Sequence, residues 1–503
     1  MKPNQIITVV VLILALTFTY CAAQVTDKEI PVTTTSNQAR VLYNKGLDMY
    51  DRYRYDDGRK QFREAVQIDS TLAMGHYQIA STPGDNKEGS QELNKALALT
   101  ERVSEGERLL IQALKAAYDG NQEKQIELLR KAIALYPGER RSRIALAGLL
   151  SGRDKDDDAI AEINAVLRID PRFASSYNQL GYIQAKREQY AEAEKALKTY
   201  TELVPDEANP YDSYGEILMK QGKHDESIAA YQKALSIDPK FSWSHTGLAN
   251  NYMFKGMPAK ARQEAQQQYD LATTDEVRRT ALWNKMMTYL YEGRYDKALE
   301  VVTQRYELAM QKGDSVAASG DLGLMGSITL EMAGMDVTKG TYLKTRTPEP
   351  NKVQEAKNLW AKSNAMAMSS STAGEWKERI PHNAAIGEAE IALRTNDLLA
   401  AKAKTEEFAT FATQRKEPWE IRTVHYLRGR IALAEKRYED ALAELNQTDL
   451  RNPNNLYWLM EVYTAVGDTE RAKEFRSKIL NVKDNSTDLA YTLQKIRSQE
   501  PNR

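Results

Sequence analysis

Four similar segments that end in proline decide the fold: LRKAIALYP (129–137), INAVLRIDP (163–171), LKTYTELVP (197–205) and YQKALSIDP (231–239). Their prolines follow one another at intervals of 34 residues. Each segment carries apolar residues at helical spacing, and proline cannot continue a helix. A fixed interval with matching flanks indicates a repeated unit, which has to be identified before any motif is interpreted.

The repeat that begins at Ala174 shows the pattern most completely. It has a large aromatic residue, a Leu-Gly pair, a small residue, a second large residue and a closing proline, at Tyr177, Leu180, Gly181, Ala193, Leu197 and Pro205. This pattern resembles the tetratricopeptide repeat (TPR) family, whose unit is a 34-residue helix–turn–helix. The resemblance implies an all-α fold, an α-solenoid in which about eleven antiparallel helix pairs form a right-handed superhelix.

The quality of the repeat varies along the chain. We expect a regular array over 39–275 and a degenerate one over 276–480, with an insertion at 335–350 and a C-terminal capping helix and tail at 481–503. Gly120, Gly222 and Gly256 share one position, where a residue of positive φ would end the first helix of a pair. Small residues at the glycine and alanine positions would let paired helices approach closely.

Length and composition agree with a stack of repeats. A chain of 503 residues exceeds what one hydrophobic core usually supports, whereas stacked pairs bury their faces on one another. Because the net charge is only −1 and basic residues do not cluster, we expect no nucleic-acid partner. One cysteine excludes a disulfide framework and cysteine-based metal sites.

The N-terminus has the features of an export signal. Lys2 precedes an apolar run from Ile6 to Tyr20, and small residues follow before Gln24. Residues 1–23 are therefore interpreted as a signal peptide and 24–38 as a polar tether, which places the protein in the periplasm or outside the cell. Two alternatives stay open: a retained anchor helix, and a lipoprotein cleaved before Cys21, in which case the protein would associate with the membrane.

Motifs for catalysis or cofactor binding are lacking in the sequence. The five histidines do not form a zinc-peptidase motif, and neither a phosphate-binding loop nor a nucleophile elbow is present. The glycine-rich stretch 319–327 falls in helical periodicity and favours close helix packing. His245 and His425 share the position of Tyr177 and favour a half-buried ring between helices. We therefore expect no catalytic residue, metal or cofactor.

The resemblance also implies where a ligand would bind. In the family, repeat positions 2, 5, 9, 12 and 13 line a concave groove. The corresponding residues form the predicted groove: Asn178, Tyr182, Lys186, Asp212, Glu216, Met219, Lys220, Trp243, Thr246, Asn250, Met253, Phe254, Trp283, Met287 and Tyr291. Its second half is aromatic and rich in methionine, which suits adaptable peptide contacts. Packing of Trp283 and Met287 against the next repeat remains an equal alternative.

The family's best-known peptide clamp uses Lys and Asn at positions 5 and 9, where this chain has Asp212 and Glu216. These carboxylates would repel a C-terminal carboxylate. The sequence therefore favours a non-enzymatic scaffold or adaptor that binds a protein or peptide in the bacterial cell envelope. The alternatives are a glycan- or solute-binding envelope lipoprotein and a hydrolase or transferase that uses the irregular region 313–378.

Overall fold

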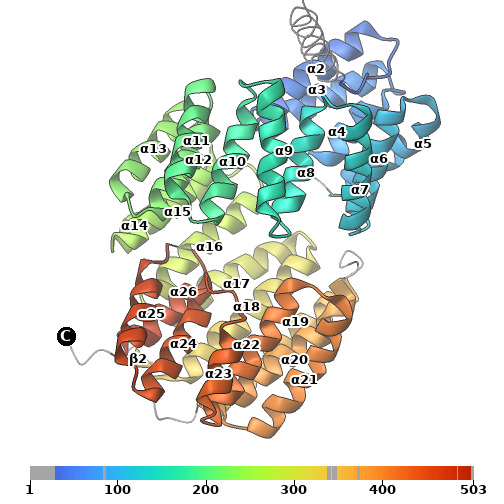
Figure 1. Ribbon diagram of the computed structural model, residues 1–503. Coiled ribbons are helices and arrows are strands. Elements are labelled where there is room, and N and C mark those ends of the chain that lie inside the picture. The colour runs from blue at the N-terminus through green and yellow to red at the C-terminus, as the bar shows by residue number, and fades with distance from the viewer. Residues whose placement is uncertain are drawn as a thin grey trace, which may run out of the picture. The chain divides into compact units, whose positions relative to one another are not determined.

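The computed structural model describes residues 29–82, 86–336, 341–342, 348–370, 374, 376–483 and 485–499. The predicted signal peptide, including Cys21, lies outside these residues. Within them, eleven helix pairs lie side by side, from α2 with α3 to α10 with α11 and from α14 with α15 to α24 with α25, so the predicted all-α solenoid of about eleven pairs is confirmed (Figure 1). None of the described helices combines the length and the apolar character that crossing a membrane requires.

The chain divides into two compact units. Unit 1 ends at Gln221 and also takes in residues 236–238, and unit 2 holds the rest. The division expected at residue 275, between regular and degenerate repeats, is of another kind and stays a prediction. The helices of unit 1 are α2 (Asn37–Asp51), α3 (Tyr55–Ile68), α4 (Ala73–Ser81), α5 (Asn86–Ala98), α6 (Glu105–Tyr118), α7 (Gln122–Leu135), α8 (Arg140–Ser151), α9 (Asp156–Ile169), α10 (Ala174–Lys186), α11 (Tyr190–Leu203) and α12 (Ala208–Lys220), with a short 3₁₀ helix at Thr100–Arg102.

Unit 2 has longer helices and one small hairpin. Its helices are α13 (His224–Ile237), α14 (Ser242–Phe254), α15 (Pro258–Leu271), α16 (Asp275–Tyr291), α17 (Tyr295–Gln311), α18 (Ser315–Ala333), α19 (Pro350–Ser369), α20 (Trp376–Arg394), α21 (Leu398–Arg415), α22 (Pro418–Ala434), α23 (Tyr438–Leu445), α24 (Pro453–Val466), α25 (Thr469–Asn481) and α26 (Thr487–Arg497). Strands β1 (Met335–Asp336) and β2 (Thr341–Tyr342) pair antiparallel within the predicted insertion.

The turn inside each regular pair repeats with the sequence. Gly120, Asp154, Glu188, Gly222 and Gly256 all have φ between 60° and 77°, and successive residues of this set are 34 positions apart. A left-handed residue ends the first helix of a pair and lets the chain reverse. The prediction from the three glycines is therefore confirmed, and two non-glycine residues take the same conformation.

Small residues bring paired helices together as expected. A Cβ atom built on Gly181 would lie 2.6 Å from Leu197 Cγ, and one on Gly429 would lie 2.6 Å from Leu445 Cγ. In both pairs the large residue follows the glycine by 16 positions. The second helix of each pair adds an apolar stripe, which in α9 consists of Ala159, Ile163 and Val166, all fully buried.

The pair α18 and α19 departs most from the regular repeat. These helices have 19 and 20 residues, and the glycine-rich stretch lies within α18. A Cβ atom on Gly326 would meet Trp360 Cδ1 at 2.5 Å, and the Trp360 indole donates to the Gly323 carbonyl at 2.9 Å. The stretch therefore serves close helix packing, as its periodicity predicted.

The described part of the predicted tether is bound to unit 1. The backbone N–H of Thr33 donates to Glu107 at 2.8 Å, and that of Ile30 donates to Glu139 at 3.3 Å. Glu107 also forms a capping box with Ser104 at the start of α6. Residues 29–36 thus extend the fold instead of leading freely into it.

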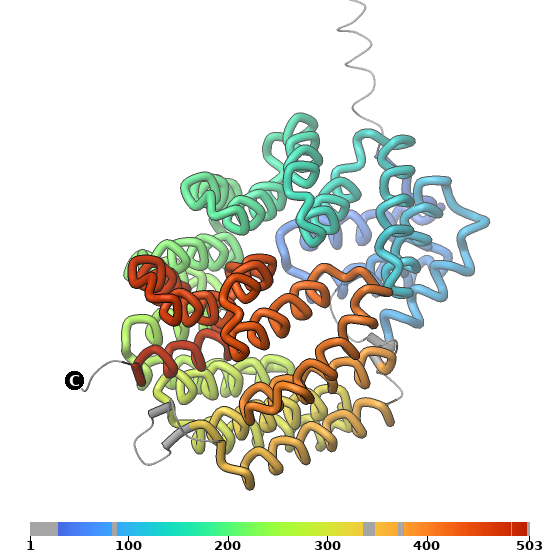
Figure 2. The backbone as a smooth tube through the Cα atoms, turned by 60° about the horizontal axis from the view of Figure 1, so that its bottom comes forward, coloured from blue at the N-terminus to red at the C-terminus, as the bar shows by residue number. Residues whose placement is uncertain are grey.

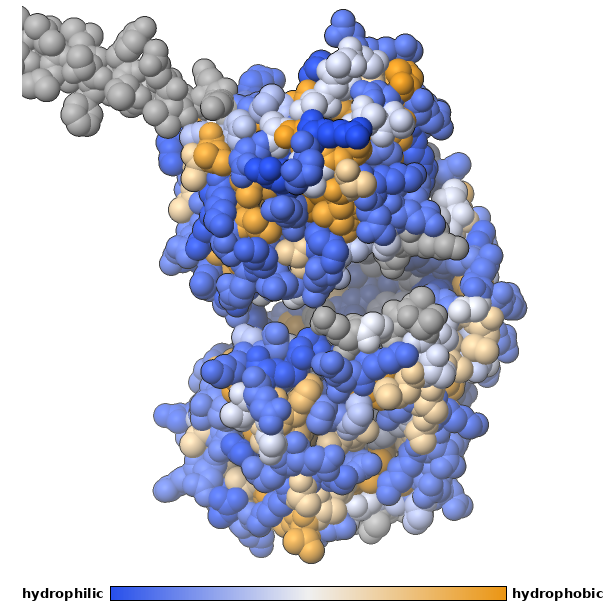
Figure 3. All heavy atoms as spheres, turned by 90° about the vertical axis from the view of Figure 1, so that its right-hand side faces the viewer, coloured by the Kyte–Doolittle hydropathy of each residue, from blue (hydrophilic) through white to orange (hydrophobic). Residues whose placement is uncertain are grey.

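The surface in Figure 3 is mostly hydrophilic, with apolar residues in small patches.

Candidate functional site

In unit 1 the turn between α2 and α3 covers part of the predicted groove. Tyr53 has a φ of 63°, and its side chain reaches a hydrogen bond with Asn178 of α10. Its ring lies 6.3 Å from that of Tyr200, and burial raises the pKa of Tyr53 to about 12. Asn178 and Asp212 are buried, so these two predicted groove residues are not open to a ligand.

Charged contacts hold this turn in place. Arg141 of α8 forms a two-point hydrogen bond with Asp51, at 3.0 and 2.5 Å. Arg52 lies 3.7 Å from Asp206 and 3.9 Å from Glu207, both near the start of α12. The turn between α2 and α3 is therefore tied to α8, three helix pairs further along the chain, and to the residues just before α12.

Three of the other predicted residues in unit 1 form a polar row across α10 and α12. The Tyr182 hydroxyl donates to Glu216 at 2.9 Å, and Glu216 pairs with Lys220 at the same distance. Burial and the nearby Glu216 carboxylate raise the pKa of Tyr182. Lys186 points instead to Asp156, at 3.0 Å, and to the Ser151 carbonyl. Met219 is buried.

The predicted residues on α14, in unit 2, have different environments. Trp243 is 62% exposed, the largest exposure of any predicted groove residue that is apolar. Thr246 accepts hydrogen bonds from Gln268 and from Asn284, at 3.0 and 2.8 Å. Asn250 and Met253 are buried. The open surface of α14 therefore lies at its N-terminal end.

Met287 corrects the prediction for α16. It is fully buried in the apolar cluster of unit 2, and Asn250, which lies equally far before the turn of its own pair, is buried as well. Trp283 is half-buried and lies under the Arg305 guanidinium, 5.4 Å from its ring centre. The alternative of packing against the next repeat therefore holds for Met287.

The C-terminal segment of the chain covers the other groove residues of unit 2. Lys483 Nζ lies 5.7 Å from the Phe254 ring centre, and Phe254 packs against Tyr291 at 6.2 Å. The Gln494 side-chain amide and the Arg497 guanidinium donate to the Tyr291 carbonyl at 2.7 and 2.8 Å. The groove of α14 and α16 thus holds a segment from the same chain.

Helix α26 is therefore more than an end cap. It lies against α16 and α24, as Figure 2 shows for its dark red trace. Ser486 caps its N-terminus, and most of its faces are buried through Leu489, Ala490, Tyr491, Thr492, Gln494 and Ile496. An end helix was expected from the sequence, but its position inside the unit follows only from these long-range contacts.

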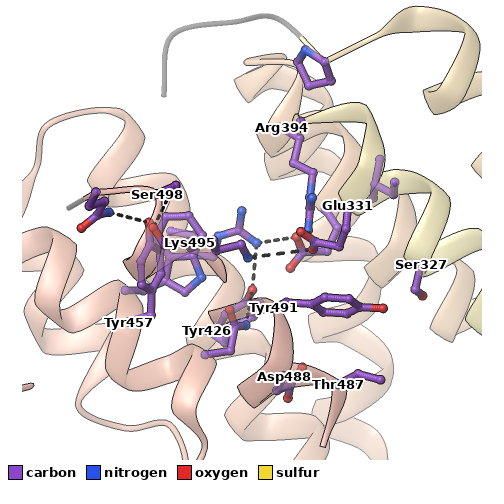
Figure 4. A pocket seen from close by; sticks show the side chains of 18 of the residues that line it. Ser327, Glu331, Arg394, Tyr426, Tyr457, Thr487, Asp488, Tyr491, Lys495 and Ser498 are labelled. Carbon is purple, nitrogen blue, oxygen red and sulfur yellow. Dashed lines mark hydrogen bonds and ion pairs between the residues drawn. The ribbon is translucent and has the colours of Figure 1, made fainter. Parts of the chain in front are cut away.

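A cavity of about 460 Å³ lies where α26 meets α18, α20, α22 and α24 (Figure 4). Glu331 of α18 forms an ion pair with Arg394 of α20 and lies 3.9 Å from Lys495 of α26. Burial alone would raise the pKa of Glu331, but Arg394 and Lys495 outweigh it and hold the pKa below its usual value. Both cations point toward Glu331 in Figure 4.

A second ion pair lines the same cavity. Arg430 of α22 pairs with Glu390 of α20, donates to the Tyr426 hydroxyl at 2.8 Å and lies 4.2 Å from the Trp458 ring centre. Burial opposes ionisation of Glu390, yet Arg430 and Arg394 lower its pKa to about 2. Charged and aromatic groups from five helices therefore converge on one space.

These residues were missed because the groove positions were not carried past Tyr291. Asn396, Lys436 and Gly467 have positive φ and mark the turns of later pairs. Counting back from them by the spacing of the regular repeats puts Tyr426 and Tyr457 at position 5, Glu390 and Arg430 at position 9 and Arg394 at position 13. The sequence already places Tyr426 and Arg430, since His425 shares the position of Tyr177, whereas the register of Glu390 and Arg394 follows from the turn at Asn396.

The two histidines at the Tyr177 position have structural roles. His245 Nδ1 lies 3.0 Å from Glu264, and His425 Nδ1 lies 2.6 Å from Glu444. Each glutamate follows its histidine by 19 residues and lies on the second helix of the same pair. Both rings therefore link paired helices, as the repeat position predicted.

Two stretches of the chain match known repeat families. Residues 174–207 match the family described as tetratricopeptide repeat, and residues 215–256 match the family described as TPR repeat. The TPR repeat-containing protein YvcD of Bacillus subtilis is 24% identical over 404 residues, which cover 71% of this chain and 81% of that protein. Human protein O-mannosyl-transferase TMTC1 is 26% identical over 185 residues, 36% of this chain and 20% of that protein.

Solved TPR structures are similar over part of the chain. Pseudomonas aeruginosa pilF is 19% identical and covers 42% of this chain and 94% of its own, with a TM-score of 0.33. The thermophilic TPR protein TTC0263 of Thermus thermophilus is 21% identical and covers 35% and 94%, with a TM-score of 0.30. This chain spans 20% of TMTC1 and 13% of the cellulose synthase operon protein C of Pseudomonas fluorescens, to which it is also similar. The chain thus contains tetratricopeptide repeats in an all-α solenoid.

Proposed function

We propose that the protein is a non-enzymatic scaffold whose unit 2 binds an amphipathic helical segment of a protein partner. The observation that supports this most is the segment already held by α14 and α16, which contacts Phe254 through Lys483 and the Tyr291 carbonyl through Gln494 and Arg497. Phe254 and Tyr291 both belong to the predicted groove. In this proposal α26 occupies the place that a partner helix takes.

The same proposal explains the exposed end of α14. Trp243, in the first turn of α14, is 62% exposed, and a large aromatic side chain contributes broad contact area with few rotatable bonds. A partner that extends beyond the length of α26 would contact it. Transferase activity is not part of the proposal, because the match to TMTC1 covers only a fifth of that protein.

We also propose that the protein is exported and acts in the bacterial cell envelope. The support is the charged start, apolar run and small residues of positions 1–23. Cleavage before Gln24 would remove the only cysteine, which suits an oxidising compartment. Detection of the mature chain in a periplasmic fraction, with Gln24 at its N-terminus, tests this part.

Binding in trans tests the groove. A fluorescent peptide of residues 482–499 is titrated into the full chain and into the double variant Gln494→Ala with Arg497→Ala, whose own helix is held less firmly. We expect the peptide to bind the double variant at least tenfold more tightly than the parent, and Phe254→Ala added to it to weaken binding. A scrambled peptide is the control. Equal binding of both peptides, or equal binding to parent and variant, contradicts the proposal.

A further inference from the structure

The cavity of unit 2 has an excess of positive charge at its centre. Arg394, Arg430 and Lys495 face two carboxylates, Glu331 and Glu390, each of which is already in an ion pair. A third carboxylate, Asp488, lies at the edge of the cavity beside Thr487 in Figure 4 and accepts a hydrogen bond from Asn452 at 2.7 Å. Since a buried charge without full compensation is costly, this centre favours an incoming anion.

Several hydrogen-bond donors around the cavity have no acceptor. Among the described residues, the Nε atoms of Arg394 and Arg430, the indole Nε1 of Trp458 and the Tyr491 hydroxyl are buried without a hydrogen-bond partner. Arg430 and Tyr491 are more than nine-tenths buried. Tyr491 extends from α26 toward Ser327 of α18 in Figure 4. Buried donors normally have a hydrogen-bond acceptor, so these four donors favour a ligand that carries several acceptor oxygens.

Flat aromatic groups form much of the wall. Trp458 lies under the Arg430 guanidinium and meets the Tyr457 ring edge-on at 5.2 Å, and Trp360 also lines the cavity. A volume of about 460 Å³ is in the range of sites for small organic molecules. The cavity therefore has unpaired hydrogen-bond donors at its centre and flat aromatic rings in its wall.

We propose that this cavity is a binding site for an organic carboxylate, with Lys495 and Arg430 receiving the carboxylate and the aromatic wall receiving its carbon skeleton. The carboxylate is either that of a free small acid or that of an acidic side chain in a bound peptide. Burial lowers the pKa of Lys495. Glu331 and Glu390 oppose this shift, whereas Arg394 and Arg430 add to it. An anion bound beside Lys495 would raise this pKa again. The site requires α26 in place, because Lys495 and Tyr491 belong to that helix.

Calorimetric titration of the full chain tests the proposal. The probes are benzoate, succinate, inorganic phosphate and an acetylated diglutamate amide. We expect at least one organic carboxylate probe to bind with a Kd below about 1 mM, more tightly than phosphate. Binding of benzoate or succinate identifies a free acid, whereas binding of the diglutamate alone identifies an acidic peptide. Binding of phosphate alone, or of no probe at 10 mM, overturns the proposal.

Variants locate the binding. Lys495→Met keeps the length of the side chain and should raise the Kd at least tenfold, while Lys495→Arg restores binding. Lys478→Met, at an exposed position on α25, is the matched control. Tyr491→Phe removes one hydroxyl and gives a second, milder variant whose Kd should rise. If Lys495→Met and Tyr491→Phe bind like the parent while melting normally, the carboxylate does not bind here. The titration with peptide 482–499 requires α26 to leave its place on α16, whereas carboxylate binding requires α26 to stay there. The proposed partner binding and the proposed carboxylate site can therefore fail separately.

Discussion

The side-chain amide of Gln494 donates to the backbone carbonyl of Tyr291 at 2.7 Å, across 203 residues of sequence. Gln494 is buried, and its amide also lies 3.4 Å from the Leu290 carbonyl at the end of α16. Both acceptors are among the last carbonyls of a helix, which have no partner within that helix. The last helix of the chain therefore completes the end of a helix in the middle of unit 2.

Gln494→Ala should loosen α26. The substitution removes one of the two side-chain donors to the Tyr291 carbonyl, and Arg497 remains, so the loss should cost about 0.5–1.5 kcal/mol. Hydrogen exchange should show faster exchange of amides in 487–497 and unchanged exchange in unit 1. Gln447→Ala, at an exposed position just after α23, is the control and should leave both unchanged. Slow exchange of α26 in the Gln494 variant would show that the apolar face alone holds the helix.

Gly326→Ala and Gly320→Ala should have opposite effects on stability. A Cβ atom at 326 would lie 2.5 Å from Trp360, so this variant should be less stable by about 1–3 kcal/mol. No atom lies within 4 Å of a Cβ at 320, where alanine should add about 0.5–1 kcal/mol by helix propensity. Urea unfolding of both variants measures the difference. Equal stability of the two would refute close packing at Gly326.

The stabilisation from Glu390 should depend on pH. Its folded-state pKa of about 2 lies below the ordinary 4.5, so the stabilisation is complete above about pH 4.5 and lost as the pH falls toward 2. Glu390→Gln leaves Arg430 without its carboxylate and should cost about 3–5 kcal/mol at pH 7.

The stability gap between parent and Glu390→Gln should narrow as the pH falls below 4.5. Urea unfolding of both proteins between pH 7 and pH 3 measures this gap. Glu474→Gln, which removes one partner of an exposed pair on α25, should differ little from the parent at any pH. A gap for Glu390→Gln that stays constant with pH would mean that the carboxylate does not act through its charge.

Trp243→Ala and Met287→Ala separate surface from core within the predicted groove. Trp243 is largely exposed, so Trp243→Ala should leave the melting temperature nearly unchanged. The same substitution should weaken partner binding. Met287 is fully buried, and its truncation should cost about 2–5 kcal/mol. Thermal unfolding of the two variants is the measurement. Strong destabilisation by Trp243→Ala would mean that this tryptophan belongs to the core.

The expectation for Phe254 changes with the structure. As a groove residue alone, it could be truncated with little effect on stability. Its ring packs against Tyr291 and lies below Lys483, so Phe254→Ala should both reduce stability and loosen the C-terminal segment. If Phe254→Ala is as stable as the parent, Phe254 is a groove residue that does not contribute to packing.

The sequence by itself determined the repeat, the turns and the packing inside each helix pair. Gly181 contacts Leu197 and the left-handed turn at Gly222 recurs at fixed intervals, because these features depend on residues within one 34-residue unit. Helix propensity and the spacing of repeat residues can be recognised in a single sequence.

Only the tertiary structure decided which groove residues are open. Tyr53 covers Asn178, and residues from Lys483 to Arg497 cover Phe254 and Tyr291, through contacts between segments far apart in the chain. The cavity likewise draws Glu331, Arg394, Arg430 and Lys495 from four different helices. Such contacts arise from how far a stack of pairs curves, and that curvature accumulates over many small packing angles that no single repeat encodes.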